Sequence, residues 1–112
     1  MAYRFVRAQP KRDRLPELYD RLDDGEIAEM EPFGNAMTKA LQNARFEPDN
    51  GEAVWVEEDY CSPPLAMERE EVLDEYFDSL TIVDEDADEA AAWDQIDGLP
   101  QLWEQVLPDA RD

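Results

Sequence analysis

The most specific structural feature of this sequence is the turn PDNG at residues 48–51. It stands between two β-prone segments, Arg45–Glu47 and Glu52–Glu58. Asp, Asn and Gly tolerate the left-handed backbone conformations that tight turns between antiparallel strands require, so the segment predicts a β-hairpin. The second strand of the hairpin contains AVWV (residues 53–56), which is apolar on both faces. This pattern favours a position inside a sheet over a position at its edge.

Hydrophobic patterns on either side of the hairpin predict the remaining elements. Alternation over Tyr3–Ala8 indicates a first strand, and apolar residues at helical spacing indicate helical segments at residues 15–24 and 33–44. These segments are compatible with one interrupted helix or with two helices. Ser62 followed by Pro63 is a typical helix start, because the hydroxyl can cap the first turn and proline suits that turn. The predicted helix carries apolar residues at positions 72, 73, 76, 77 and 80, and the last strand is predicted at 79–83.

The resulting order is strand, helix, strand, strand, helix, strand. This order predicts an α+β fold, a ferredoxin-like βαββαβ sandwich in which helices cover one face of a four-stranded antiparallel sheet. Residues 1–84 form this predicted domain. Residues 85–112 are expected to be an acidic linker and a C-terminal helical extension of the same domain. In this interpretation the run Asp84–Glu89 lies in solvent, and the apolar side of LPQLWEQVL packs against the domain or a partner.

The amino-acid composition indicates a folded chain in an unusual ionic environment. The 112 residues carry a formal net charge of −20, yet 43% of them are hydrophobic, so one domain with a modest core is expected. Lysine occurs only at positions 11 and 39. A carboxylate-rich surface nearly free of lysine resembles the cytosolic proteins of halophiles that accumulate salt. Molar salt shortens the Debye length to about 3 Å and screens the repulsion among the carboxylates. The alternative is an acidic coat that mimics nucleic-acid phosphates.

The sequence predicts a cytoplasmic protein. The first ten residues, MAYRFVRAQP, lack the apolar stretch of a signal peptide, and no apolar segment is long enough to span a membrane. Cys61 is the only cysteine, which excludes an internal disulfide and a multi-cysteine zinc site.

Motifs for catalysis are absent from the sequence. Without histidine, the chain lacks imidazole-based acid–base catalysis, Ser-His and Cys-His nucleophile pairs and imidazole metal ligands. Its four glycines form no phosphate-binding loop. Pairs of carboxylates are uninformative among thirty acidic residues. We therefore expect no metal site and no cofactor, and the sequence favours a protein that is not an enzyme.

The connection between the central strand and the next helix, Glu57–Arg69, is the strongest candidate for a site. It holds two consecutive prolines and a mixed-charge group beyond what a connector needs. The phenol of Tyr60 and the guanidinium of Arg69 are well suited to bind a ligand, and the alternative is a rigid connector with Arg69 paired to a nearby acid. A helix N-terminus would make Cys61 more reactive, whereas acidic neighbours or burial would make it less so. The candidate ligand-binding residues are Trp55, Glu58, Tyr60, Cys61 and Arg69.

A basic N-terminal segment offers an alternative site for nucleic acid. Residues 1–14 contain five cationic side chains and one acidic side chain. In a ferredoxin-like sheet the first and third strands are the central pair, so we expect Tyr3 or Phe5 to share the open face with Trp55. Aromatic side chains beside arginines stack bases in the RNA-recognition version of this architecture, although its glycine- and lysine-bearing motif is missing here and the overall charge repels phosphates. The candidate residues are Tyr3, Arg4, Phe5 and Arg7.

An open sheet face with large aromatic residues must be covered, because extended exposed apolar patches are rare on monomers. A second copy of the chain or the segment LPQLW would cover it, and we expect a homodimer. The leading hypothesis is a cytosolic small-ligand or protein-interaction module adapted to high salt. The alternatives are a small enzyme with a carboxylate, tyrosine or cysteine pocket at Glu57–Arg69, a nucleic-acid binder and a nucleic-acid mimic.

Overall fold

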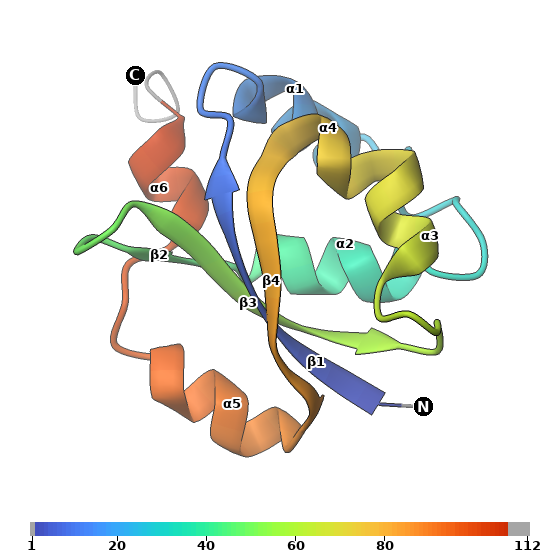
Figure 1. Cartoon of the computed structure of the whole chain (residues 1–112). Coiled ribbons are helices and arrows are strands. Elements are labelled where there is room, and N and C mark those ends of the chain that lie inside the picture. The colour runs from blue at the N-terminus through green and yellow to red at the C-terminus, as the bar shows by residue number, and fades with distance from the viewer. Residues whose placement is uncertain (1, 108–112) are drawn as a thin grey trace.

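A four-stranded antiparallel sheet organises the α+β fold of this chain (Figure 1), for which a computed structural model describes residues 2–107. The elements along the chain are β1 (Ala2–Pro10), α1 (Leu15–Asp23), α2 (Gly34–Gln42), β2 (Arg45–Glu47), β3 (Glu52–Asp59), α3 (Ala66–Glu68), the π-helical segment η1 (Arg69–Leu73), α4 (Asp74–Tyr76), β4 (Phe77–Ala87), α5 (Glu89–Ile96) and α6 (Leu102–Val106). No helix within residues 2–107 has the length and apolar content of a membrane span.

The strands lie in the order β2-β3-β1-β4, and each neighbouring pair is antiparallel. The first and third strands are therefore the central pair, as predicted. The predicted hairpin is also confirmed. The N–H of Gly51 donates to the carbonyl of Glu47 at 2.8 Å, and Gly51 has a φ of +75°, which glycine adopts without steric strain.

One face of the sheet carries the larger hydrophobic core. Val6 of β1 pairs with Trp55 of β3, and both are buried against apolar residues of α1, α2, α4 and α6. The ring of Trp55 lies 5.1 Å from that of Phe77. The expectation that Tyr3 or Phe5 would share a face with Trp55 is wrong. The register pairs Trp55 with Val6, and successive side chains of a strand point to opposite faces.

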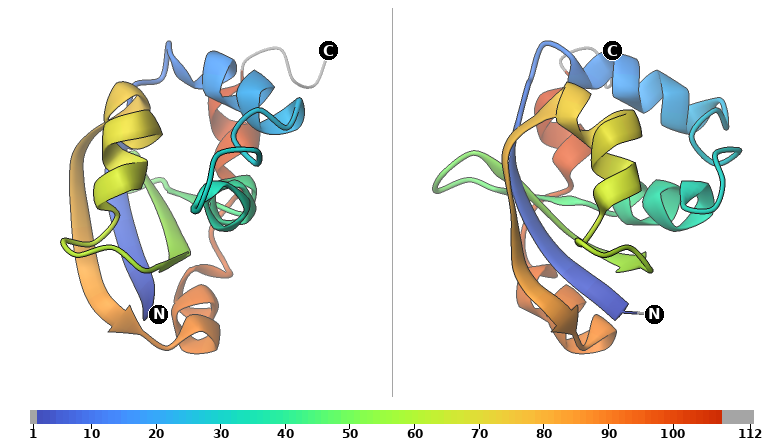
Figure 2. Two further views of the ribbon diagram at one scale, coloured as in Figure 1. Left: turned by 90° about the vertical axis from the view of Figure 1, so that its right-hand side faces the viewer. Right: turned by 45° about the vertical axis from the view of Figure 1, so that its right-hand side comes forward.

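The opposite face of the sheet is covered by α5. Phe5, Val54 and Val56 form a second buried cluster there with Ala92 and Ile96 of α5. Figures 1 and 2 place this helix at the end of the sheet where β4 ends, away from α1 and α4. In the segment LPQLW, expected as a cover for this face, Leu99 packs against this cluster, whereas Leu102 and Trp103 belong to the core on the other side.

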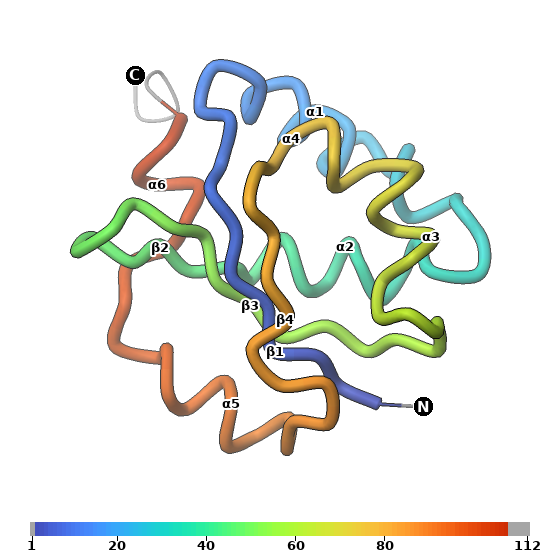
Figure 3. Tube along the Cα trace, viewed as in Figure 1, coloured from blue at the N-terminus to red at the C-terminus, as the bar shows by residue number. Residues whose placement is uncertain are grey.

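The two helical segments before the hairpin are separate helices joined by residues 24–33 (Figure 3). Gly34 begins α2 where the chain approaches itself closely. A Cβ atom at Gly34 would lie 2.4 Å from the carbonyl oxygen of Ile27 and 2.7 Å from that of Ala28, so this contact requires glycine. The indole of Trp103 in α6 donates to the carbonyl of Leu41 at 2.7 Å and ties α6 to α2.

The predicted helix start at Ser62 is wrong. Helix α3 begins at Ala66, and the residue that precedes it, Leu65, has a left-handed φ of 59°. From α3 the chain runs without a break through η1 and α4 (Figure 3), and the helix ends at Tyr76. Phe77 therefore begins β4 and does not belong to the helix.

The acidic run Asp84–Glu89 is not a linker. Strand β4 continues to Ala87, and α5 begins at Glu89 after a single intervening residue. That residue, Asp88, caps the helix by accepting the N–H of Ala91 at 2.9 Å. Charged side chains are compatible with this part of β4 because it is an edge strand whose side chains reach water.

Candidate functional site

Acidic side chains converge beneath the connection from β3 to α3. Alternation along β3 turns Trp55, Glu57 and Asp59 toward the helices, and Glu68 of α3 lies opposite them. Glu57 is 1% exposed, Asp59 is 2% exposed and Glu68 is 1% exposed. Charged residues are rarely buried so completely unless they are paired, so this group has no ordinary place in a hydrophobic core. We call Glu57, Asp59, Cys61 and Glu68 the junction cluster.

Asp59 is the carboxylate of the cluster with the most partners. It accepts hydrogen bonds from Arg4 Nε at 3.0 Å, from the N–H of Leu65 at 2.8 Å and from the N–H of Cys61 at 3.1 Å. Burial by itself would raise the pKa of Asp59, but these two backbone donors and the guanidinium outweigh burial and lower it. Asp59 is therefore ionised in the folded protein.

The surroundings of Glu57 and Glu68 shift their pKa values in the opposite direction from that of Asp59. The indole of Trp55 donates to Oε1 of Glu57 at 3.1 Å, but Oε2 of Glu57 is buried and receives no donor within the described residues. Burial first, and then the neighbouring charge of Glu68, raise the pKa of Glu57 well above its usual value. Burial also raises the pKa of Glu68, and the charge of Asp59 adds to this effect. The two glutamates thus face each other and bind protons more readily than exposed ones.

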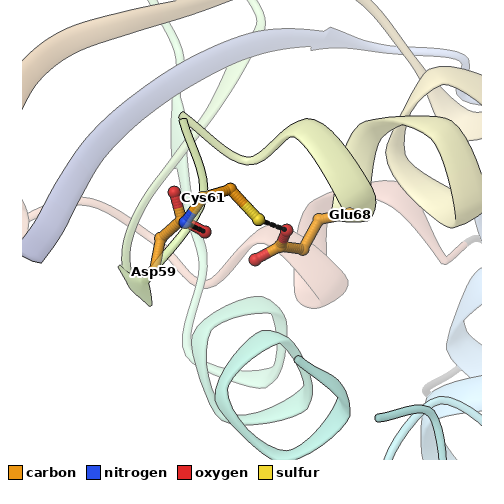
Figure 4. Close-up of side chains that lie close together, drawn as sticks. All are labelled: Asp59, Cys61 and Glu68. Carbon is orange, nitrogen blue, oxygen red and sulfur yellow. Dashed lines mark hydrogen bonds between the residues drawn. The ribbon is translucent and has the colours of Figure 1, made fainter. Parts of the chain in front are cut away.

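The thiol of Cys61 completes the cluster. Its Sγ donates to Oε1 of Glu68 at 3.6 Å, as Figure 4 shows, and one ligand atom each from Asp59, Cys61 and Glu68 lie within 4.8 Å of one another. Burial, followed by the negative charges of Glu68 and Asp59, raises the pKa of the Cys61 thiol. The backbone of Met67, in the first turn of α3, lowers the pKa of this thiol, but burial and the two carboxylates outweigh it, so the predicted activation of Cys61 by a helix N-terminus is not supported.

A small cavity of about 30 Å³ adjoins the cluster, which is room for one or two water-sized groups. Its walls are Pro32, Phe33, Ala36, Glu58, Asp59, Tyr60, Cys61, Met67 and Glu68. A second hollow of about 50 Å³ lies beside it, and Ala36 and Glu58 line both. Neither space accommodates an organic substrate in contact with the carboxyl groups.

The structure brings together three of the five predicted ligand-binding residues and separates the other two. Glu58, Tyr60 and Cys61 line the 30 Å³ cavity, and the phenol of Tyr60, which is 70% exposed, donates to Glu58 at 2.9 Å. Trp55 is fully buried in the core and reaches the cluster only through Glu57. Arg69 lies outside the cavity wall and pairs with Asp74 at 3.3 Å.

The N-terminal residues considered for nucleic acid do not form a stacking surface. Arg4 is bonded to Asp59, and Arg7 pairs with Glu52 at 3.3 Å. Phe5 is buried beneath α5, while Tyr3 is half-buried in the wall of the 50 Å³ hollow. The basic first strand thus meets acidic residues of its own chain.

The sequence interpretation missed Glu57, Asp59 and Glu68 as members of one site. The pattern that could have found them is the continuation of the buried face of β3, because Trp55, Glu57 and Asp59 alternate in WVEED. This pattern is not distinctive in the sequence, because the chain contains thirty acidic residues and acidic residues two positions apart are therefore common. Comparisons of the chain with protein-family models, curated proteins and solved structures give no match.

Proposed function

We propose that this chain is a non-enzymatic ligand-binding domain whose ligand is held at the junction cluster. One observation carries the proposal: Glu57, Asp59 and Glu68 are buried together. Within the described residues, Arg4 is the one cationic side chain bonded to them. A small, positively charged or proton-donating ligand would supply the missing compensation.

The energetics of burial support a role beyond folding. Removing a carboxylate from water costs several kcal/mol unless opposite charge and hydrogen bonds replace its hydration. Asp59 obtains this replacement from Arg4 and two backbone N–H groups, whereas Oε2 of Glu57 obtains none. Folding alone would be served better by apolar side chains or by glutamine at these positions. Residues that oppose stability in this way are typical of binding sites.

The alternative of an enzyme at Glu57–Arg69 has less support. General acids and bases must lie within hydrogen-bond reach of the group that reacts. Here the carboxyl groups with raised pKa are about 99% buried, and the adjoining cavity of about 30 Å³ holds only a water-sized group. The side chains that water does reach, Tyr60 and Arg69, are bonded to other acidic residues.

Our proposal also includes the fold class of the chain and the ionic environment in which the protein works. We assign the chain to the ferredoxin-like class on its strand–helix–strand–strand–helix–strand order and on the sheet order β2-β3-β1-β4. We assign it to a cytoplasm of high salt on its net charge of −20 and on its two lysines.

A ligand screen in molar KCl tests the proposal. The full chain, the double variant E57Q/E68Q and the control E70Q/E71Q are compared by thermal unfolding with cations, amines and small polar metabolites. Glu70 and Glu71 are exposed on the continuous helix that carries Glu68, so the control replaces the same number of carboxyl groups outside the cluster. At least one ligand class is expected to raise the Tm of the wild type and of the control but not of E57Q/E68Q. Equal shifts in all three proteins, or no shift in any, would contradict the proposal.

The homodimer that we propose would form through the edge of β4 and not through an open sheet face. The sheet face that needed a cover has one in α5, but β4 presents an edge of 11 residues whose described pairing is with β1 alone. Exposed strand edges pair readily with one another. We expect a dimer in light scattering at molar KCl, and a proline introduced at Val83, which is 49% exposed, should weaken it. A wild-type monomer at high concentration would contradict the dimer.

A further inference from the structure

We infer that the junction cluster is a site for one divalent metal ion of the zinc class, bound by Asp59, Cys61 and Glu68 with Glu57 as the fourth donor. This inference rests on the proposed ligand-binding function and names the ligand. It departs from the expectation, based on the absent histidines, that the chain has no metal site.

The geometry places suitable ligand atoms together. One oxygen of Asp59, Sγ of Cys61 and one oxygen of Glu68 lie within 4.8 Å of one another (Figure 4). Metal–oxygen and metal–sulfur distances of about 2.0–2.3 Å put the donors around a tetrahedral ion about 3–4 Å apart. The cluster therefore needs to contract by about 1 Å, which side-chain rotation can supply because the 30 Å³ cavity adjoins it.

Glu57 is an independent observation that points to a ligand at this place. Its carboxyl group is buried and faces Glu68, and Oε2 receives no N–H or hydroxyl donor within residues 2–107. A proton on Glu57 would be held in a hydrogen bond to Glu68. Buried polar atoms in native proteins nearly always have a partner, and an ion is one of the recognised explanations when they do not. A bound cation would replace this proton, and Glu57 would then add a fourth ligand to the three ligand atoms that lie within 4.8 Å of one another.

The charges of the site favour a divalent cation. With the thiol and both glutamates deprotonated on binding, the four ligands carry four negative charges, and Arg4 supplies one positive charge within hydrogen-bond distance. A divalent ion would remove two of the three negative charges that remain. Metal ions also lower the pKa of a coordinating thiol enough to deprotonate it, so the present protonation of Cys61 does not oppose binding.

The donor set and the space select the class of ion. Calcium takes six to eight oxygen ligands, and magnesium keeps several of its waters. A cavity of about 30 Å³ beside these four donors leaves no room for either shell. One soft thiolate with carboxylate oxygens in a four-coordinate arrangement suits zinc, and cobalt can occupy such a site as a spectroscopic probe.

The experiment is a titration of the full chain in molar KCl after treatment with a chelator and reduction by a phosphine. Zn²⁺ is added in a calorimeter, and Co²⁺ is added under absorption spectroscopy, with Mg²⁺ as the hard-ion comparison. We expect one Zn²⁺ per chain and a thiolate-to-cobalt charge-transfer band in the near ultraviolet. E68Q should weaken Zn²⁺ binding at least tenfold, and C61S should abolish the band. E70Q, which removes an exposed carboxylate from the same helix, should bind like the wild type.

Two results would overturn the metal site. One is Zn²⁺ binding in E68Q and C61S that equals binding in E70Q, since this would mean attraction to the acidic surface alone. The other is Co²⁺ binding without the thiolate band. If either is found while a different ligand still stabilises the wild type but not E57Q/E68Q, the metal assignment fails and the ligand-binding function stands. If no ligand separates those proteins, both fail. Unfolding of E68Q and C61S without metal verifies that they are folded.

Discussion

At the scale of single residues, Arg4 links three parts of the chain. Its guanidinium donates to the carboxylate of Asp59, to the carbonyl of Cys61 at 2.9 Å and to the carbonyl of Glu85 in β4. The Arg4 side chain is 12% exposed and that of Asp59 is 1% exposed. Such a buried pair behaves differently from a surface pair, because loss of one partner leaves the other charge buried without compensation.

Replacement of Arg4 should therefore be strongly destabilising. We expect R4A to lower the free energy of unfolding by about 3 kcal/mol or more. The matched control is R7A on the same strand, because the Arg7–Glu52 pair is more exposed and should contribute about 0–1 kcal/mol. Denaturant unfolding in molar KCl measures both. Equal effects of the two substitutions would mean that the Arg4–Asp59 pair acts as an ordinary surface ion pair.

Glu57 makes stability depend on pH in the metal-free protein. Because burial and the neighbouring Glu68 raise its pKa in the folded state, the folded protein binds a proton that the unfolded chain has already lost. The contribution of Glu57 to stability is thus present below about pH 4.3, the usual pKa of glutamate, and is lost as the pH rises through the folded-state value.

The substitution E57Q should remove this loss of stability at high pH, since glutamine has the shape of the protonated acid and also offers a hydrogen-bond donor. In the presence of chelator, we expect E57Q to be more stable than the wild type at pH 8, on the order of 1 kcal/mol or more, and the difference to shrink toward pH 4. Urea unfolding over this pH range measures the difference. A difference that stays constant with pH would show that Glu57 does not titrate in this way.

At the scale of the elements, close packing at the start of α2 fixes how this helix meets the segment that joins it to α1. Gly34 lies against the backbone carbonyls of Ile27 and Ala28, which cannot move aside as a flexible side chain could. The same helix contributes Met37 and Leu41 to the core beneath the sheet and contacts α6 through Trp103. The contact at Gly34 therefore sets the position of α2 in that core.

Alanine at position 34 should be destabilising, although alanine is normally the better helix residue. We expect G34A to lower the free energy of unfolding by about 1–3 kcal/mol, because a methyl group must be forced between backbone atoms. G98A is the control. A Cβ at Gly98 would meet no atom within 4 Å, and its effect should stay within about 0.5 kcal/mol. Thermal unfolding compares the two, and a neutral G34A would mean that the segment around Ile27 and Ala28 moves away from α2 without a measurable cost in stability.

At the scale of the whole molecule, charge is distributed so that the basic first strand and its loop are neutralised internally. Arg4, Arg7, Lys11 and Arg14 each pair with an acidic residue of β3, β4 or a helix. These internal pairs engage cations of the first fourteen residues, and the rest of the chain stays strongly negative although it contains Arg21, Arg45 and Arg69. The folded state concentrates that charge on a small surface, so it suffers more self-repulsion than the unfolded chain.

Salt should therefore stabilise the fold as a whole. We expect the Tm to rise as KCl increases from dilute buffer to the molar range, where the Debye length falls to about 3 Å. Tetramethylammonium chloride at equal ionic strength distinguishes screening from specific potassium binding. A Tm that does not change between dilute buffer and 2 M KCl would contradict adaptation to high salt.

The sequence by itself determined the local structure. PDNG specified the hairpin because its residues adopt the turn conformation without strain. Hydrophobic periodicity located the two N-terminal helices and gave the order of helices and strands along the chain. The sequence did not determine where the fourth strand ends, since charged residues are compatible with an edge strand and with a linker alike. It also placed a helix start at Ser62, where a backbone turn through Leu65 comes first.

Only the tertiary structure decided the faces of the sheet and the site. The register of β1 against β3 put Val6 beside Trp55 and turned Phe5 to the other side. The same register brought Arg4 to Asp59, 55 residues away in sequence, and the packing of α3 turned Glu68 toward Asp59. Periodicity reports which residues of one element share a face. It does not report which faces meet, because that depends on burial and pairing between segments far apart in the chain.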